Sequence, residues 1–229
     1  MGAETFLKTI TDISLILDGS YVHQTPDGVK NVQLEFELIK DYPGGAGQQV
    51  RAVRMRLHHG THVDAPMHFV PGGAAINEIP IERFCGPVVL VDLTPIGDNE
   101  QIRPEHLEKG LAGRNIAGQR VLIRTDWNKN YGKPDYAARA PYLGPAAVDW
   151  LASRKPVLVG YDCAHSKDAP DSPAPDYAVR TFLENGIITM GYVRNLDQVD
   201  PARDLTLVAL PLAFANVEAS PVRAVVIQS

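Results

Sequence analysis

The chain has 229 residues, of which 45% are hydrophobic and 21% are charged, and its formal net charge at pH 7 is -5. A chain of this length can bury one core, so we expect a single domain over residues 1–229. The acidic balance provides no basic surface for nucleic acid or an anionic membrane, and we expect a small-molecule substrate and further copies of the chain as partners.

Targeting signals and disulfides are also not expected. The first twenty residues carry several charged side chains and lack the apolar core of a signal peptide. Cys85 and Cys163 are too few for a disulfide framework, and no apolar run approaches the roughly 18 residues that a membrane-spanning helix needs. We therefore expect a cytoplasmic protein with no membrane segment.

The first predicted elements are strands separated by turns. Strands are predicted over residues 13–17 and 32–39, with a turn at residues 26–28. Residues 42–47 are glycine-rich, and we interpret them as a mobile loop, part of a lid, rather than a phosphate-binding loop because they lead into a strand. Apolar and polar residues alternate over residues 53–57, which predicts a strand with one buried face.

Strands and helices alternate in the rest of the chain, which is typical of an α/β fold. The apolar runs, helix-start prolines and closing glycines predict four helical segments and six strands. Helical segments are expected over residues 79–84, 104–111, 145–154 and 176–185, and strands over 87–93, 121–123, 157–161, 187–190, 205–210 and 222–227. A long loop is expected over residues 128–142.

Four of the seven histidines fall between His58 and His68, and their spacing suggests one site. Continued as an extended chain, the preceding alternation places His58, His62, Asp64 and His68 on one side and turns His59 away. Two imidazoles and a carboxylate suit zinc, manganese or iron, and they leave coordination positions open for water or substrate. The pattern therefore predicts a catalytic metal site.

Two other readings of this segment are weaker. A helix that presents His58 and His62 as a two-histidine metal ladder is disfavoured, because glycine and proline interrupt the segment and no glutamate follows His58. Surface or core histidines around a bend would explain one histidine better than the whole set with its aspartate. We therefore expect ligands that converge from a strand end and the loop after it.

The order His-x-Gly-Thr-His-x-Asp-x-Pro-x-His-Phe, from His58 to Phe69, closely resembles the signature of the cyclase family of metal-dependent hydrolases, which includes bacterial kynurenine formamidases and isatin hydrolases. Further stretches that look similar to the family are residues 12–14, 71–73, 86–92, 195–197, 211–212 and 220–224. The resemblance implies a swivelling α/β fold with a mixed sheet and flanking helices, a divalent metal, hydrolysis of an amide or ester in a small molecule, and assembly into homodimers or homotetramers.

The resemblance also implies roles for the clustered residues. His58, His62 and Asp64 are expected to bind the metal, and His68 to move protons, a task for which an unperturbed histidine pKa near 6.5 is suited. The alternative that His68 is a fourth ligand stays open. Members with two metals carry a histidine and a glutamate where this chain has Val179 and Gly191, so we expect one ion per chain, zinc or manganese.

Two residues outside the cluster are candidates for binding substrate. Trp127 follows a predicted strand and could be an aromatic platform, although a core role explains it equally well. The preceding Asp126 replaces a glycine that is common in the family, which would alter the pocket wall. His165 also follows a strand end and could bind substrate or supply a ligand. A thiol nucleophile formed by Cys163 and His165 is disfavoured because no third group orients the base.

The sequence therefore predicts a metal-dependent hydrolase that cleaves an amide, such as a lactam or an N-acyl or N-formyl amine, or a lactone. The metal would lower the pKa of water and polarise the carbonyl. Two alternatives remain: a non-hydrolytic cyclase or dehydratase on the same site, and a ligand-binding protein whose site has decayed.

Overall fold

The structure, a computed structural model, describes residues 8–18, 33–42, 47–163 and 167–229. Its strands are β1 (Thr9–Asp12), β2 (Glu35–Lys40), β3 (Val50–Arg54), β4 (His62–Asp64), β5 (Cys85–Asp92), β6 (Gln101–Ile102), β7 (Arg120–Arg124), β8 (Tyr142–Leu143), β9 (Leu158–Tyr161), β10 (Ile188–Gly191), β11 (Leu205–Val208), β12 (Ala219–Pro221) and β13 (Val225–Gln228). The α-helices are α1 (Pro104–Leu111), α2 (Tyr136–Arg139), α3 (Pro145–Ser153) and α4 (Tyr177–Glu184). Short 3₁₀ turns cover Pro66–His68, Ile76–Glu78, Ile81–Phe84, Trp127–Asn130 and Leu196–Gln198.

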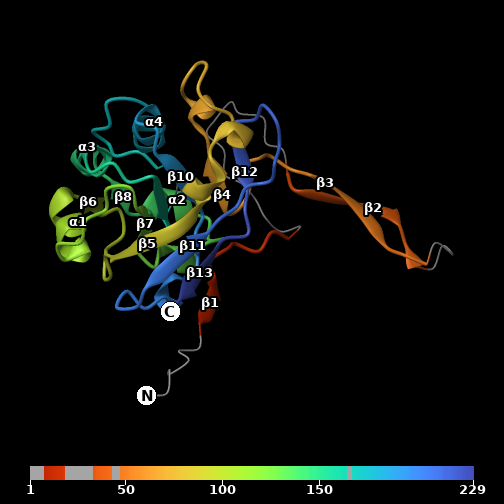
Figure 1. Ribbon diagram of the computed structural model, residues 1–229, viewed down its shortest axis with the longest axis horizontal. Coiled ribbons are helices and arrows are strands. Elements are labelled where there is room, and N and C mark those ends of the chain that lie inside the picture. Colours follow the sequence, from red (N-terminus) through yellow and green to blue (C-terminus); the bar gives the residue numbers. More distant parts are fainter. Residues whose placement is uncertain (1–7, 19–32, 43–46, 164–166) are drawn as a thin grey trace.

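Nine strands form one mixed sheet in the order β1-β13-β11-β5-β7-β9-β10-β4-β12. The central strands β5, β7, β9 and β10 are parallel, and the strands on either side of them pair antiparallel. Helices α1, α3 and α4 lie together on one side of the sheet (Figure 1). The mixed α/β architecture with flanking helices confirms the predicted fold class.

Alternating side chains of the parallel strands fill two apolar layers. On β7, Val121 and Ile123 point into the layer that contains residues of α1, α3 and α4, whereas Leu122 points into the opposite layer. The opposite layer is closed by strands of the same sheet, including Val63 of β4 and Val226 of β13. Burial on both faces explains why the central strands are apolar runs without polar alternation.

The first predicted strand is wrong by several residues. Residues 13–17 are not a strand, and the first strand is instead β1. Ile13 is fully buried and its backbone nitrogen donates to Ala224 O at 3.0 Å, whereas the nitrogen of Leu15 donates to the Thr61 hydroxyl at 2.7 Å. Because Ile13 and Leu15 bond to different segments, no regular ladder forms here.

The half-buried strand predicted over residues 53–57 is also wrong. The strand there is β3, it pairs with β2 alone, and every residue of both strands is exposed. The resulting hairpin projects away from the rest of the molecule (Figure 1). The turn predicted at residues 26–28 and most of the predicted loop at 42–47 lie outside the described residues.

Several other elements agree with the sequence and some were missed. Helix α1 has the predicted bounds, and α3, α4 and the parallel strands lie where they were expected, within a few residues. The predicted loop 128–142 instead contains α2 and leads into β8, and β12 was not predicted. In the described ranges, no helix is both long and apolar enough to cross a membrane.

Candidate metal centre and active site

The motif lies inside the sheet, contrary to the expectation of a strand end followed by a loop. Strand β4 is inserted between β10 and β12, so that Asp64 lies opposite Thr189 on one side and Ala219 on the other. Val63 enters the core, and the two neighbouring side chains, His62 and Asp64, therefore point to the other face. Both are 1% exposed.

The predicted cluster gathers around one carboxylate. Asp64 Oδ1 lies 2.9 Å from His58 Nδ1 and 3.4 Å from His62 Nε2. The His68 ring lies 4.5 Å from the His58 ring, centroid to centroid. His59 is turned away, and its Nδ1 accepts a hydrogen bond from the Arg56 backbone nitrogen at 2.9 Å. The structure thus brings together all four side chains that the alternation placed on one side.

Neighbouring groups fix the orientation of this cluster. The Thr189 hydroxyl donates to Asp64 Oδ2 at 2.7 Å, which leaves Oδ1 directed at the histidines. His62 Nδ1 lies 2.8 Å from the carbonyl oxygen of Gly60, which can only accept a hydrogen bond, so Nδ1 carries the proton. Gly60 has a φ of +63°, and a Cβ there would meet Leu17 at 2.7 Å, so the bend requires glycine.

This orientation fits a bound cation. When His62 Nδ1 carries the proton, its Nε2 presents a lone pair to Asp64 Oδ1 at 3.4 Å. Both atoms are then acceptors, and a positive ion bound by both would stabilise their close approach. His58, Asp64 and His68 each offer a ligand atom, and these three atoms lie within 4.8 Å of one another. Two nitrogens and one oxygen suit a borderline divalent metal.

Glu218 is part of the cluster and was missed by the sequence reasoning. Its Oε1 lies 3.2 Å from His58 Nε2, so His58 stands between two carboxylates. Burial lowers the pKa of His58, but the hydrogen bonds with Asp64 and Glu218 outweigh this and raise it to about 9. The hydrogen bond with His58 in turn lowers the pKa of Glu218. Glu218 lies two residues before the family-like segment 220–224, and no local pattern distinguishes it.

Val179 and Gly191 stand at the positions where members with two metals carry further ligands. Val179 is buried on α4, the helix that contacts the 3₁₀ turn at Pro66–His68. Gly191 is the direct partner of His62 in the ladder between β10 and β4. A valine and a glycine offer no side-chain ligand.

A small pocket of about 10 Å³ lies between the segments that follow β7 and β10. Three tyrosines line it together with smaller groups: Tyr131, Tyr136, Tyr192, Leu15, Asn128, Val193 and Arg194. The ring of Tyr192 lies 5.9 Å from the His62 ring, centroid to centroid. One residue of the aromatic pocket wall, Tyr192, therefore contacts a residue of the cluster.

Trp127 supports this wall rather than forming it. Its side chain is buried in the core, and its indole nitrogen donates to the carbonyl oxygen of Tyr136 at 2.9 Å. The two rings stack with centroids 6.4 Å apart. Of the two explanations given for Trp127, the core role fits this geometry, and the tyrosines provide the aromatic surface.

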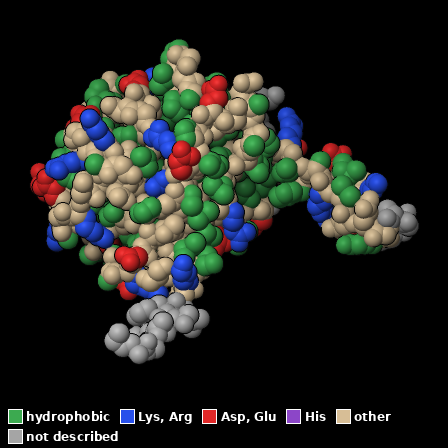
Figure 2. Space-filling model, in the orientation of Figure 1, with side chains coloured by type: hydrophobic (Ala, Val, Ile, Leu, Met, Phe, Trp, Pro, Cys, Tyr) green, Lys and Arg blue, Asp and Glu red, His purple; other side chains and the backbone are tan. Residues whose placement is uncertain are grey.

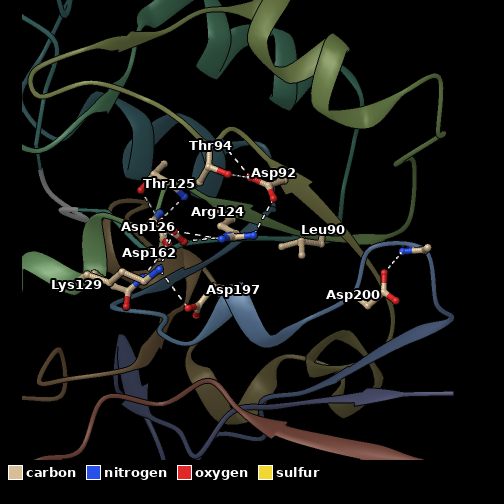
Figure 3. Close-up of polar contacts among 12 residues, drawn as sticks. Leu90, Asp92, Thr94, Arg124, Thr125, Asp126, Lys129, Asp162, Asp197 and Asp200 are labelled. Carbon is tan, nitrogen blue, oxygen red and sulfur yellow. Dashed lines mark hydrogen bonds and ion pairs between the residues drawn. The ribbon is translucent and has the colours of Figure 1, made fainter.

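Polar side chains at the carboxyl ends of β7 and β9 fix the segment that follows Trp127 (Figure 3). Asp126 adopts a φ of +61°, where glycine is favoured, and its carboxylate bonds to Arg124 at 2.7 Å and to Lys129 at 2.8 Å. Asp162 accepts a hydrogen bond from Asn128, a pocket residue, at 3.0 Å. Ion pairs with Arg124 and Lys129 thus hold Asp126 at the position where the family commonly has glycine.

Cys163 is unsuited to the role of a nucleophile. Burial raises the pKa of the Cys163 thiol, which disfavours the thiolate that a nucleophile requires. His165 lies outside the described residues.

Fold and site together define an α/β domain with a buried histidine and aspartate cluster that fits a divalent metal. The family model described as "Putative cyclase" matches residues 11–168. A kynurenine formamidase from Paracidovorax citrulli is 39% identical over 77% of this chain and 78% of its own length, and one from Bordetella petrii is 35% identical over 83% and 84%. The solved structure of isatin hydrolase A from Labrenzia aggregata, bound to benzyl benzoate, is similar with a TM-score of 0.84 and 30% identity, covering 96% of this chain and 93% of the other. The chain belongs to the cyclase family, as its motif predicted.

Proposed function

We propose that the protein is a metal-dependent hydrolase that cleaves an amide bond in a small molecule at the Asp64 cluster. The observation that carries the proposal is the convergence of two histidine nitrogens on Asp64 Oδ1, at 2.9 and 3.4 Å. Relatives named as a formamidase and an isatin hydrolase support hydrolysis over the non-hydrolytic and decayed alternatives.

In this proposal His58, His62 and Asp64 hold the ion, with Thr189 and Gly60 fixing the donor atoms. A divalent ion, when bound, lowers the pKa of water and polarises a carbonyl oxygen. His68 takes the proton from the attacking water and returns it to the leaving nitrogen. Its ligand atom lies within 4.8 Å of those of His58 and Asp64, which keeps open the alternative that His68 is a fourth ligand.

We propose that the substrate is an aromatic amide, such as an N-formyl or N-acyl arylamine or a lactam fused to an aryl ring. The pocket beside His62 offers the faces and edges of three tyrosines, which bind aryl rings through offset and edge-to-face contacts. A lactone with the same ring is an alternative substrate.

We propose one metal ion per chain, zinc or manganese. Imidazole and carboxylate ligands suit both metals. The valine and glycine at positions 179 and 191 support a single site.

We propose that the chain forms a homodimer or homotetramer through the β2–β3 hairpin. Phe36 pairs with Val53, so these side chains lie with Leu38 on one face of the hairpin, and they are 47%, 55% and 44% exposed. Hydrophobic side chains on this hairpin are visible in Figure 2. An isolated two-stranded hairpin is at most marginally stable in water, and a second copy of the chain would cover its apolar face.

Light scattering on the purified protein tests this assembly. We expect the double variant Phe36→Ser and Val53→Ser to lower the measured mass towards that of one chain. Glu37→Gln, on the other face of the hairpin, is the matched control and should keep the assembly. An unchanged mass in the double variant would contradict the role of the hairpin.

Two smaller proposals concern the chain as a whole. The pairing of β1 with β13 joins distant parts of the chain in one sheet and supports a single domain over residues 1–229. Cys85 and Cys163 are free thiols, which supports a reducing, cytoplasmic location.

Metal analysis combined with an activity screen tests the main proposal. The purified protein is stripped of metal, reloaded with zinc or manganese, and assayed on N-formyl anilines, isatins, lactams and lactones. We expect hydrolysis that is lost on stripping and regained on reloading. A protein that binds metal but hydrolyses none of these compounds would overturn the proposal in favour of a binding function.

A further inference from the structure

Glu218 contacts a residue of the metal centre from a distant part of the chain. It directly precedes β12, and its backbone carbonyl accepts a hydrogen bond from the Ala65 nitrogen at 2.8 Å. The next residue, Ala219, lies opposite Asp64 in the ladder. The sheet therefore fixes the distance between the Glu218 backbone and the metal centre.

We propose that Glu218 is a positioning residue that holds the proton on His58 Nε2 and so reserves His58 Nδ1 for the metal ion. This inference rests on the proposed metal-dependent function. The two contacts of His58 carry it: Nε2 lies 3.2 Å from Glu218 Oε1, and Nδ1 lies 2.9 Å from Asp64 Oδ1.

The two nitrogens of the His58 imidazole take different roles. A neutral histidine donates from one nitrogen and accepts, or binds metal, through the other. Without Glu218, the proton would be stabilised on Nδ1 by Asp64, and Nδ1 could then not bind an ion. An ionised Glu218 can only accept, so it favours the proton on Nε2 and leaves the Nδ1 lone pair directed at Asp64 and the ion.

The position of Glu218 makes it suitable for mutation. Its side chain is 37% exposed, so its truncation opens no cavity in the core. Its backbone hydrogen bond with Ala65 does not depend on the side chain. Variants of Glu218 should therefore fold, which thermal melting of the metal-free protein will verify.

The first test is the zinc dissociation constant of the metal-free full-length protein, measured by competition with a chromophoric chelator. We expect Glu218→Ala to weaken binding by roughly 10- to 100-fold, as is usual for groups that orient metal-bound histidines. Glu218→Gln keeps an acceptor oxygen without the charge and should lie between Ala and wild type. Glu105→Ala, at an exposed site on α1, should match wild type. Affinity within about twofold of wild type for Glu218→Ala would overturn the proposal.

The second test identifies the nitrogen of His58 that binds. In the zinc-loaded protein, ¹⁵N NMR of the imidazole should show a proton on Nε2 and metal on Nδ1. Coordination through Nε2 would overturn the proposal, as would an unchanged ring in Glu218→Ala. If the wild-type protein binds no zinc at all, the proposed function fails. If it binds zinc and hydrolyses amides but Glu218 variants behave as wild type, the positioning role alone fails.

Discussion

Gly191 lies directly opposite His62 in the antiparallel ladder between β10 and β4. A residue without a side chain thus stands next to the candidate metal ligand, and Val179 on α4 is equally unable to coordinate. We expect close to one equivalent of metal per chain, measured by elemental mass spectrometry on protein purified without added chelator. Two tightly bound equivalents would show that other residues complete a second site.

Replacing Asp64 with asparagine should abolish metal binding without unfolding the protein. The amide oxygen can still accept the Thr189 hydrogen bond, but the negative charge shared by the two histidines is lost. We expect the zinc dissociation constant to rise by more than about 100-fold, since even residues that only orient ligands contribute 10- to 100-fold. The exposed Asp171→Asn is the control. Full metal content in Asp64→Asn would refute the ligand assignment.

Replacing His68 with alanine should reduce turnover by 10²–10⁴ while the metal affinity stays near that of wild type, because a positioned acid or base contributes about that much. Kinetics and zinc titration on the same preparation check both quantities. His106→Ala, at a half-buried position on α1 outside the cluster, is the matched control. A large rise in the metal dissociation constant would instead make His68 a ligand.

The buried carboxylate of Asp162 should make stability depend on pH. Burial raises its pKa to about 6, although hydrogen bonds from Thr125, Asn128 and Asp126 oppose this shift. Because the folded pKa exceeds the unfolded value of 3.8, the resulting stabilisation is fully present below about pH 4 and is lost as the pH rises through 6. It amounts to at most about 3 kcal/mol.

Carbon-13 NMR of the aspartate carboxyl groups measures this titration directly. We expect one buried resonance with a midpoint near pH 6, and Asp162→Asn identifies it by its disappearance. Urea unfolding at pH 4.5 and 7.5 gives the accompanying change in the free energy of unfolding. A midpoint below pH 4 would contradict the expectation.

Local sequence signals were sufficient for the elements whose determinants are local. Helix α1 begins at Pro104, whose missing N–H is not needed at a helix start, and it ends before Ala112, which has a φ of +48°. The apolar runs of β5 and β7 predicted strands buried on both faces. The members of the cluster around Asp64 could also be predicted, but the extended geometry that grouped them holds only for His62 and Asp64 on β4, because His58 lies in a turn and His68 in a 3₁₀ turn.

Interactions between distant segments could not be predicted in the same way. The alternation of apolar and polar residues over 53–57 indicates a strand. It does not reveal whether other parts of the same chain cover the apolar face of that strand, and among the described residues they do not. Strand β4 is three residues long, too short to show a period. Glu218 is separated from His58 by 160 residues, and its role depends on a strand pairing that no local pattern encodes.

The insertion of β4 between β10 and β12 affects when the protein first becomes able to bind metal during its synthesis. The complete motif leaves the ribosome early, but the two strands that flank it are made more than a hundred residues later. Until then the motif has no neighbours to fix Asp64 and His62. We expect a nascent chain arrested after β9 to carry every residue of the motif and yet to bind zinc only weakly, so that the last part of translation activates the site.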